Sequence, residues 1–302
     1  MSATLTLGTR GSDLAIAQSR LIAEQLLEQA GVSTQLEVVS TTGDREQHLS
    51  PDKATWSMGA FVKELEDALL DHRIDLAVHS YKDMATAVTP GLQVAAVPAR
   101  GAAHDVLVCS DAASAEDLRA ALNAGTTSRC IIGTSSPRRS AQLRASLGCR
   151  VVPLRGNVPT RLRKLKQRAG SGEMHAICLA AAGLDRLCIR PEFTVTLPIE
   201  SFPTAASQGA LAVQTRAGES WVPEVAALDH APTRRATDAE RSFLSTIEAG
   251  CHTPAAAHAV CNGDIISLQA ELFDAELKRA SALCSGQNPL DVGREAGLCV
   301  LA

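Results

Sequence analysis

Aromatic residues are scarce in this 302-residue chain, where phenylalanine, tryptophan and tyrosine together make up 3%. Proteins that bind single-stranded nucleic acid stack the bases on aromatic side chains, so the scarcity argues against such a platform. Apolar residues make up 45% and charged residues 21%, which is an ordinary globular composition. A chain of this length can bury a full core and divide into two or three domains.

The sequence also lacks a long apolar segment. The N-terminal "MSATLTLGTR" has no apolar signal core, and no later stretch reaches 18 uncharged apolar residues. We therefore expect a cytoplasmic protein that does not enter a membrane.

No C-x-x-C pair occurs among the nine cysteines. The odd number of cysteines and their scattered spacing indicate reduced, mostly buried thiols. Because cysteine and histidine are not clustered at the spacing of metal ligands, we expect no metal site. One cysteine differs in its setting. Cys251 follows Gly250 in a turn and precedes His252, so it is a candidate for covalent chemistry.

Acidic residues are absent between Asp117 and Glu173, although twelve of the 29 basic residues lie there. This segregation predicts a local site for a polyanion. Nucleic acid is the weaker interpretation because the net charge is −4. A solvated basic helix explains the basic residues of 163–168, but it does not explain arginines placed in turns.

Strand and helix patterns alternate over the first two thirds of the chain. Strands are expected at 4–8, 33–41, 74–80, 129–133, 150–154 and 175–181, and helices at 13–29, 59–73, 137–148 and 159–168. This alternation predicts α/β domains with parallel sheets, whose ligands lie beyond the carboxyl ends of strands. After about residue 218 we expect a helix at 234–248, a hairpin turn at Asn262-Gly263, a third strand at 278–285 and a C-terminal helix. We expect a smaller α+β domain with a three-stranded antiparallel sheet there.

Three strand–turn–helix junctions carry arginine. "GTSSPRR" places Arg138 and Arg139 in the first turn of a helix, where Ser135 or Ser136 can be the N-cap and the helix dipole disfavours a cation. "PLRGNVPTR" places Arg155 and Arg161 at the next junction, and "GTRGSD" places Arg10 and Ser12 at the first. Helix N-termini bind anions, and arginine adds bidentate recognition of carboxylate or phosphate. Since no glycine-rich phosphate loop is present, a small molecule with several carboxylates fits best.

The segment "AVHSYKDM" ends another strand with Lys82 and Asp83. Taken alone, the two residues are most simply a surface ion pair. At the carboxyl end of a strand and facing arginine turns, Asp83 becomes a candidate for acid–base catalysis or for stabilising a cation.

Several of these segments together resemble the porphobilinogen deaminase (hydroxymethylbilane synthase) family. The matching segments occur in the family's order from residue 7 to about 254: "LGTRGSDLAIAQ", "GAFVKELEDALLDHRIDLAVHSYKD", "GTSSPRRSAQL", "LRGNVPTRLRKL", "LAAAGLDRL", "SQGALAVQ" and "EAGCHTP". The resemblance implies two doubly wound domains like the lobes of periplasmic binding proteins, plus the small α+β domain. The implied boundaries are 1–99 with 200–217, 100–199, and 218–302.

The resemblance also implies a reaction and a set of site residues. Four porphobilinogen molecules would be joined head to tail with release of ammonia, primed by a dipyrromethane cofactor held as a thioether on Cys251. Asp83 matches the catalytic carboxylate. Cofactor carboxylates would be held by Lys82, Ser136, Arg138 and Arg139. Substrate rings would be bound by Arg10, Ser12, Arg155, Arg161, Arg186 and Gln208. The family implies a monomer that uses porphobilinogen and has no nucleic-acid or membrane partner.

The sequence departs from the family pattern at four places. Met58, in the lid segment "TWSMGAF", stands where lysine is expected, Ala85 replaces a proline, Ser207 replaces a glycine, and 102–105 reads "AAHD". The alternatives left open are a slow paralogue with an altered lid and a two-lobed polycarboxylate-binding protein without catalysis.

Overall fold

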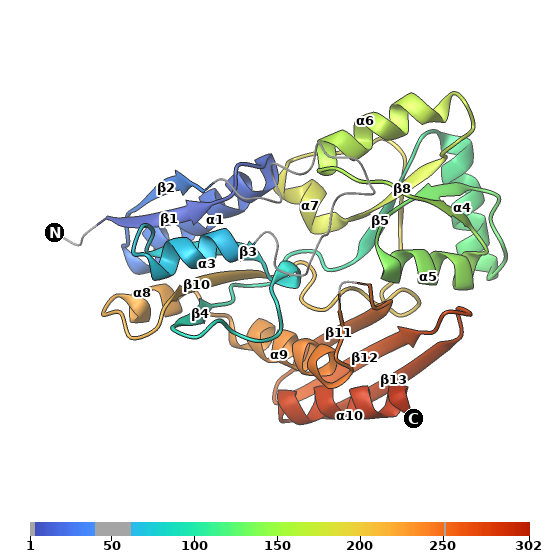
Figure 1. Ribbon diagram of the computed structural model, residues 1–302. Helices are drawn as coiled ribbons and strands as arrows, with labels where there is room; N and C mark the ends of the chain where they lie inside the picture. The colour runs from blue at the N-terminus through green and yellow to red at the C-terminus, as the bar shows by residue number, and fades with distance from the viewer. Residues whose placement is uncertain (1–3, 40–61, 251) are drawn as a thin grey trace.

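The computed structural model describes residues 4–39, 62–250 and 252–302, whose strands form three sheets (Figure 1). In order, the first sheet comprises β2 (Thr34–Val38), β1 (Leu5–Thr9), β3 (Leu76–Ser80), β10 (Leu211–Arg216) and β4 (Leu92–Ala96). The second comprises β7 (Arg150–Val152), β6 (Ile131–Gly133), β8 (Ala176–Ala180), β5 (Asp105–Cys109) and β9 (Thr194–Thr196). The mixed α/β architecture predicted from the alternating pattern is confirmed.

The parallel pairing predicted for these sheets holds only in part. β1 pairs parallel with β2 and β3, and β6 pairs parallel with β7 and β8. In contrast, β10 runs antiparallel to β3 and β4, and β5 runs antiparallel to β8 and β9. The expectation was wrong for these strands because β5 enters the second sheet from β4 of the first, and β10 enters the first sheet from β9 of the second, without a helix crossover within one sheet.

Helices flank both sheets, and four of the seven begin at a side-chain cap that the sequence provides. Around the first sheet lie α1 (Asp13–Ala30), α3 (Lys63–Leu70) and α8 (Val222–Ala226); around the second lie α4 (Ala112–Ala124), α5 (Pro137–Leu147), α6 (Val158–Ala169) and α7 (Ala181–Arg186). The Ser12 and Ser136 hydroxyls accept hydrogen bonds from the backbone N–H of Ala15 and Arg139. Ser136 is thus the N-cap of α5, with Pro137 at the first helical position, as predicted.

The C-terminal part forms the predicted three-stranded antiparallel sheet. Its strands are β11 (Ala255–Asn262), β12 (Ile265–Phe273) and β13 (Arg279–Gly286), packed against α9 (Ala231–Thr246) and α10 (Pro289–Leu301) (Figure 1). Gly263, with φ of 58°, lies in the tight turn between β11 and β12. Phe243 of α9 is fully buried in this core.

One buried carboxylate joins the three sheets. Glu240 of α9 is inaccessible to solvent and accepts from both terminal nitrogens of Arg100, at 2.7 and 3.2 Å. It also accepts from the backbone N–H of Ser207 and, at 2.7 Å, of Ala259 in β11. A buried carboxylate is stable only when its oxygens are bonded in this way, so α9 is fixed against both connections between the α/β units.

The connection at 207–209 returns the chain to the first sheet and is conformationally restricted. Gly209 has φ of 86°, and a Cβ there would lie 2.7 Å from the Gly101 carbonyl oxygen. Ser207 also has a left-handed backbone, with φ of 60°, and its buried hydroxyl has no hydrogen-bond partner among the described residues. A serine in this conformation is strained, whereas glycine is not.

The eight cysteines that the structure describes are free thiols, five of them buried. Within the same ranges, no helix is both long and apolar enough to span a bilayer.

Ser207→Gly should therefore stabilise the protein. Compared with Ser207→Ala, which also removes the unbonded hydroxyl but keeps the strained backbone, we expect glycine to raise the free energy of unfolding by about 1 kcal/mol. Urea denaturation of the two variants and the native chain measures this. Equal stability of the glycine and alanine variants would contradict the assignment of strain to residue 207.

Candidate active site

The candidate catalytic residues lie on a single turn at the carboxyl end of β3. The strand ends at Ser80, whose hydroxyl is hydrogen-bonded to Gln18 of α1, and the chain then forms the short 3-10 helix η1 (Tyr81–Asp83). Tyr81 is buried, while Lys82 and Asp83 are exposed. This turn presents an ammonium and a carboxylate side by side at the edge where ligands bind in α/β sheets.

Arg138 and Arg139 lie opposite this turn and share one buried carboxylate. Asp105, at the start of β5, accepts from Arg138 at 2.8 Å and from Arg139 at 2.7 Å. The exposed fractions are 1% for Asp105, 4% for Arg138 and 7% for Arg139. The two guanidinium groups outweigh the effect of burial and hold the pKa of Asp105 well below its usual range. Both arginines are therefore fixed in place by an acid behind them.

Gln208 connects this ion cluster to the catalytic turn. Its side-chain nitrogen donates to Asp105 at 2.9 Å and to the Ala103 carbonyl at 2.6 Å. Its side-chain oxygen accepts from Lys82 at 3.3 Å and from Arg139 at 3.4 Å. Fully buried Gln208 therefore occupies the centre of the cluster rather than its margin.

Lys82 lies in a strongly positive environment. Desolvation, together with the Arg139 guanidinium, lowers the pKa of Lys82 from 10.5 to about 8, although Asp83 and Asp105 oppose the change. Lys82 is exposed, so solvent partly screens the repulsion from Arg139. A bound anion would relieve this electrostatic repulsion.

Arg161, in the first turn of α6, belongs to the same electrostatic group. It donates to the Gly156 carbonyl at 2.7 Å. Desolvation and Arg139 lower the pKa of Arg161 to about 10, against the opposing effects of Cys178 and Asp83. Four basic side chains thus surround two carboxylates: Lys82, Arg138, Arg139 and Arg161 around Asp83 and Asp105. The excess of positive charge fits a polyanionic ligand.

The other predicted ligands of substrate lie around this group in different settings. Arg186 of α7 donates to the Gly209 carbonyl at 2.6 Å, and desolvation lowers the pKa of Arg186 to about 10. Arg155 is exposed, with its loop fixed by Lys164, which donates to the Arg155 carbonyl at 3.0 Å. Arg10 is half-buried near His79.

Two of the predicted anion ligands already have a structural role. The hydroxyls of Ser12 and Ser136 accept from helix N–H groups at 3.3 and 3.4 Å. A capping hydroxyl can still donate its own hydrogen to an anion beside the helix N-terminus. Capping therefore leaves both hydroxyls able to bind an anion.

Asp105 is the functional residue that sequence reasoning missed. Its signal was its place: it is the acid before the apolar "VLVC", and no acidic residue occurs between 117 and 173 to neutralise the two arginines. A buried arginine pair requires a carboxylate partner, but Asp111, Glu116 and Asp117 lie nearer to the arginines in the chain, so this signal alone does not select Asp105.

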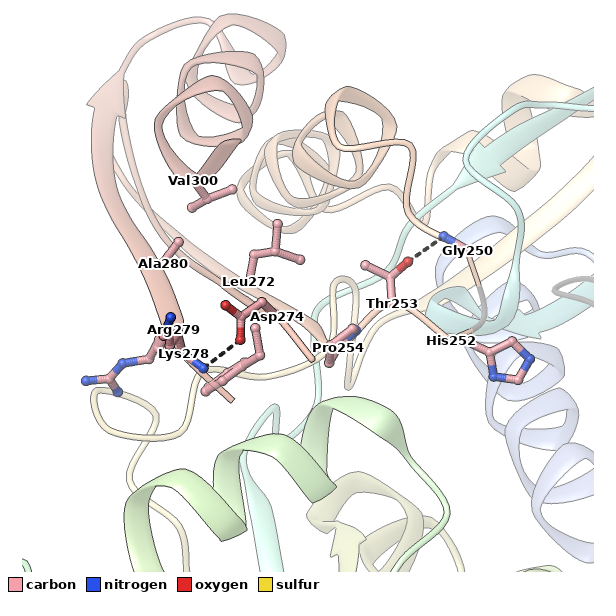
Figure 2. Close-up of a pocket in the computed structure, with 11 residues that line it drawn as sticks. Gly250, His252, Thr253, Pro254, Leu272, Asp274, Lys278, Arg279, Ala280 and Val300 are labelled. Atoms are coloured by element: carbon pink, nitrogen blue, oxygen red, sulfur yellow. Dashed lines mark hydrogen bonds between the residues drawn. The ribbon is translucent and has the colours of Figure 1, made fainter. Parts of the chain in front are cut away.

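Cys251 and the lid segment 56–58 lie outside the described residues. The residues beside Cys251 border a cavity of about 730 Å³ in the C-terminal part (Figure 2). The cavity is lined by Gly250, His252, Thr253, Pro254, Leu272, Phe273, Asp274, Lys278, Arg279, Ala280 and Val300. The Thr253 hydroxyl accepts from the Gly250 N–H at 2.9 Å, which fixes the chain on both sides of position 251.

The chemistry of the cluster fits a group that carries carboxylates. The Nε–H groups of Arg138 and Arg139 are buried and have no acceptor among the described residues. Buried donors of this kind are normally paired, and carboxylate oxygens are their strongest acceptors.

Comparison with known proteins agrees with this chemistry. The family described as "Porphobilinogen deaminase, dipyromethane cofactor binding domain" matches residues 5–224, and "Porphobilinogen deaminase, C-terminal domain" matches residues 235–301. The porphobilinogen deaminase of Mycolicibacterium gilvum is 41% identical over 313 residues, covering 99% of this chain and 94% of that protein. That of Mycobacterium leprae is 44% identical over 256 residues, covering 84% of this chain and 76% of that protein.

Solved structures with a similar arrangement include substrate binding domain 2 of Lactococcus lactis GlnP. It is 9% identical, covers 76% of this chain and 88% of that chain, and has a TM-score of 0.43, which is too low to support an argument about function. The sequence comparisons are decisive by themselves. The chain belongs to the porphobilinogen deaminase family, and residues 5–224 correspond to the part of that family that binds the dipyrromethane cofactor.

Proposed function

We propose that this protein joins four porphobilinogen molecules head to tail to give hydroxymethylbilane, releasing one ammonia at each step. The observation that carries the proposal is the pairing of the exposed Lys82–Asp83 turn with the cluster of Arg138, Arg139 and Arg161. Porphobilinogen has one pyrrole ring that carries an acetate and a propionate. A growing chain of such rings therefore requires several cationic partners. We also propose, from the family resemblance alone, that the enzyme is a cytoplasmic monomer.

Asp83 is the proposed catalytic residue. Loss of the aminomethyl nitrogen from porphobilinogen breaks a C–N bond and leaves a cationic azafulvene. A carboxylate beside that cation stabilises it, and the same group can give a proton to the departing amine and accept one from the attacked pyrrole. Its place on η1, beyond the carboxyl end of β3, puts the carboxylate next to the arginine cluster.

The proposed cofactor ligands are Lys82, Ser136, Arg138 and Arg139, with attachment at Cys251. When bound, the dipyrromethane group supplies the terminal pyrrole to which the first substrate is joined. Arg139 and Lys82 can donate to its carboxylates beside Gln208, and the unpaired Nε–H groups of Arg138 and Arg139 can donate to further carboxylate oxygens. Asp105 keeps the two guanidinium groups in place before any ligand is bound.

The proposed ligands of substrate rings are Arg10, Ser12, Arg155, Arg161, Arg186 and Gln208. Arg161 interacts electrostatically with Asp83, and Gln208 accepts a hydrogen bond from Lys82. Arg186 bonds the 207–209 connection between the two α/β units. We propose the domain boundaries 1–99 with 200–217, 100–199 and 218–302, which place this connection between the first two domains.

Asp83→Asn should nearly abolish turnover while the cofactor stays attached. Losing an acid–base group lowers rates by about 10²- to 10⁴-fold, and the thioether does not depend on Asp83. Product formation and intact mass measure the two effects. Asp264→Asn, an exposed residue with a side chain 90% accessible, is the matched control and should change neither. Near-normal product formation by Asp83→Asn would contradict the catalytic role and favour a polycarboxylate-binding protein.

Loading of apoprotein with porphobilinogen should depend on the charge of Lys82. A lysine with a pKa near 8 is cationic below that pH and neutral above it, so its attraction for carboxylates is lost as pH rises from 7 to 9. Arginine stays charged over this range. Intact mass measures the loading rates of the native chain and of Lys82→Arg. The ratio of the native rate to the variant rate should therefore fall as the pH rises. The ratio cancels any effect of pH on the cysteine thiol or the substrate, and a constant ratio would contradict the lowered pKa.

A further inference from the structure

Arg241 extends from α9 in the C-terminal part to the turn that carries Lys82 and Asp83. Its guanidinium carbon lies 4.4 Å from the centre of the Tyr81 ring. One terminal nitrogen donates to the carbonyls of Met84 at 3.3 Å and Tyr81 at 3.5 Å, and the other donates to the Ala85 carbonyl. A single side chain therefore contacts both ends of the turn.

Two of these carbonyls, those of Met84 and Ala85, follow the short helix and accept hydrogen bonds from elsewhere in the protein. The last carbonyls of a short helix have no partner within it, and η1 provides one internal bond, from the Met84 N–H to the Tyr81 carbonyl at 3.2 Å. The strand side of the turn is held by the Tyr81 N–H, which donates to the Ala210 carbonyl at 3.1 Å. Arg241 supplies the remaining donors on the other side.

The guanidinium is used for the backbone rather than for an ion pair. Within the described ranges, Arg241 has no carboxylate oxygen within 4.0 Å. Desolvation lowers the pKa of Arg241, while Tyr81 and Asp238 oppose this effect. Placing a cation here is unfavourable unless the carbonyls and the ring face compensate it, so the arrangement stabilises one position of the turn.

We propose that Arg241 is a positioning residue that fixes Lys82 and Asp83 from outside the active site. The inference rests on the proposed role of Asp83. Helix α9 then has two roles. Glu240 binds Arg100 and the 207–209 connection, and the adjacent Arg241 binds the catalytic turn. Arg241 thereby sets the position of the reacting carboxylate through the turn that carries it.

Arg235 provides a matched control on the same helix. It also donates to three backbone carbonyls, those of Gly263, Asp264 and Gln287, at 2.8 to 3.0 Å. All three belong to the C-terminal part and none touches η1. Arg235→Gln therefore removes a similar set of bonds from the same helix while leaving the catalytic turn intact.

The test compares Arg241→Gln, Arg241→Lys and Arg235→Gln as cofactor-loaded enzymes. We expect Arg241→Gln to lower kcat by about 10- to 100-fold with less than about a threefold change in KM, because misplacing a catalytic group by an ångström has effects of this size. Arg241→Lys should recover part of the loss, since it keeps the charge over the ring with fewer donors. Arg235→Gln should keep kcat within about twofold.

Hydrogen exchange provides a readout that does not depend on turnover. The peptide covering 80–86 should exchange faster in Arg241→Gln than in Arg235→Gln, at equal melting temperature. If both variants lose kcat and protection equally, Arg241 is only structural and the proposal is overturned. If Arg241→Gln does not fold, Arg241→Lys is compared with Arg235→Lys by the same criteria. Failure of the native holoenzyme to convert porphobilinogen would instead overturn the proposed function.

Discussion

The buried carboxylate of Asp105 is the interaction on which the site depends. It lies between two guanidinium groups that are almost fully buried, and neither could remain there without it, because unpaired buried charge is strongly destabilising. The same carboxylate fixes Gln208, which in turn bonds Lys82. One acid at the start of a β-strand therefore sets the positions of three candidate ligands from both α/β units.

The cluster of basic side chains around Asp105 carries an excess of positive charge. Asp105 neutralises only part of the charge of Arg138, Arg139, Lys82 and Arg161, and repulsion from Arg139 adds to desolvation, the larger cause, in lowering the pKa values of Lys82 and Arg161. This explains why arginines occupy the first turn of a helix, where the dipole disfavours them. The basic side chains repel one another in the unliganded protein. Bound carboxylates relieve this repulsion, and its relief contributes to the binding free energy.

The sequence predicted the elements of the fold better than the contacts between them. The cap at Ser136, the arginine turns and the Asn262-Gly263 hairpin follow from local patterns and are confirmed. Antiparallel insertion of β10 was not predictable from alternation, because strand direction depends on long-range pairing. Asp105 and Arg241 were missed for the same reason: their partners lie 33 and 157 residues away in the chain. The assignment of individual binding roles came from family resemblance and stays a prediction.

The intact mass of purified Asp105→Asn, beside the native chain and Cys251→Ala, tests the central claim most directly. The native protein should exceed its chain mass by two linked pyrrole units, and Cys251→Ala should not. If Asp105 organises the cofactor ligands, the folded Asp105→Asn variant should be recovered mostly without the added mass, and porphobilinogen should load it slowly. Full occupancy of the folded variant, with normal loading, would contradict the account.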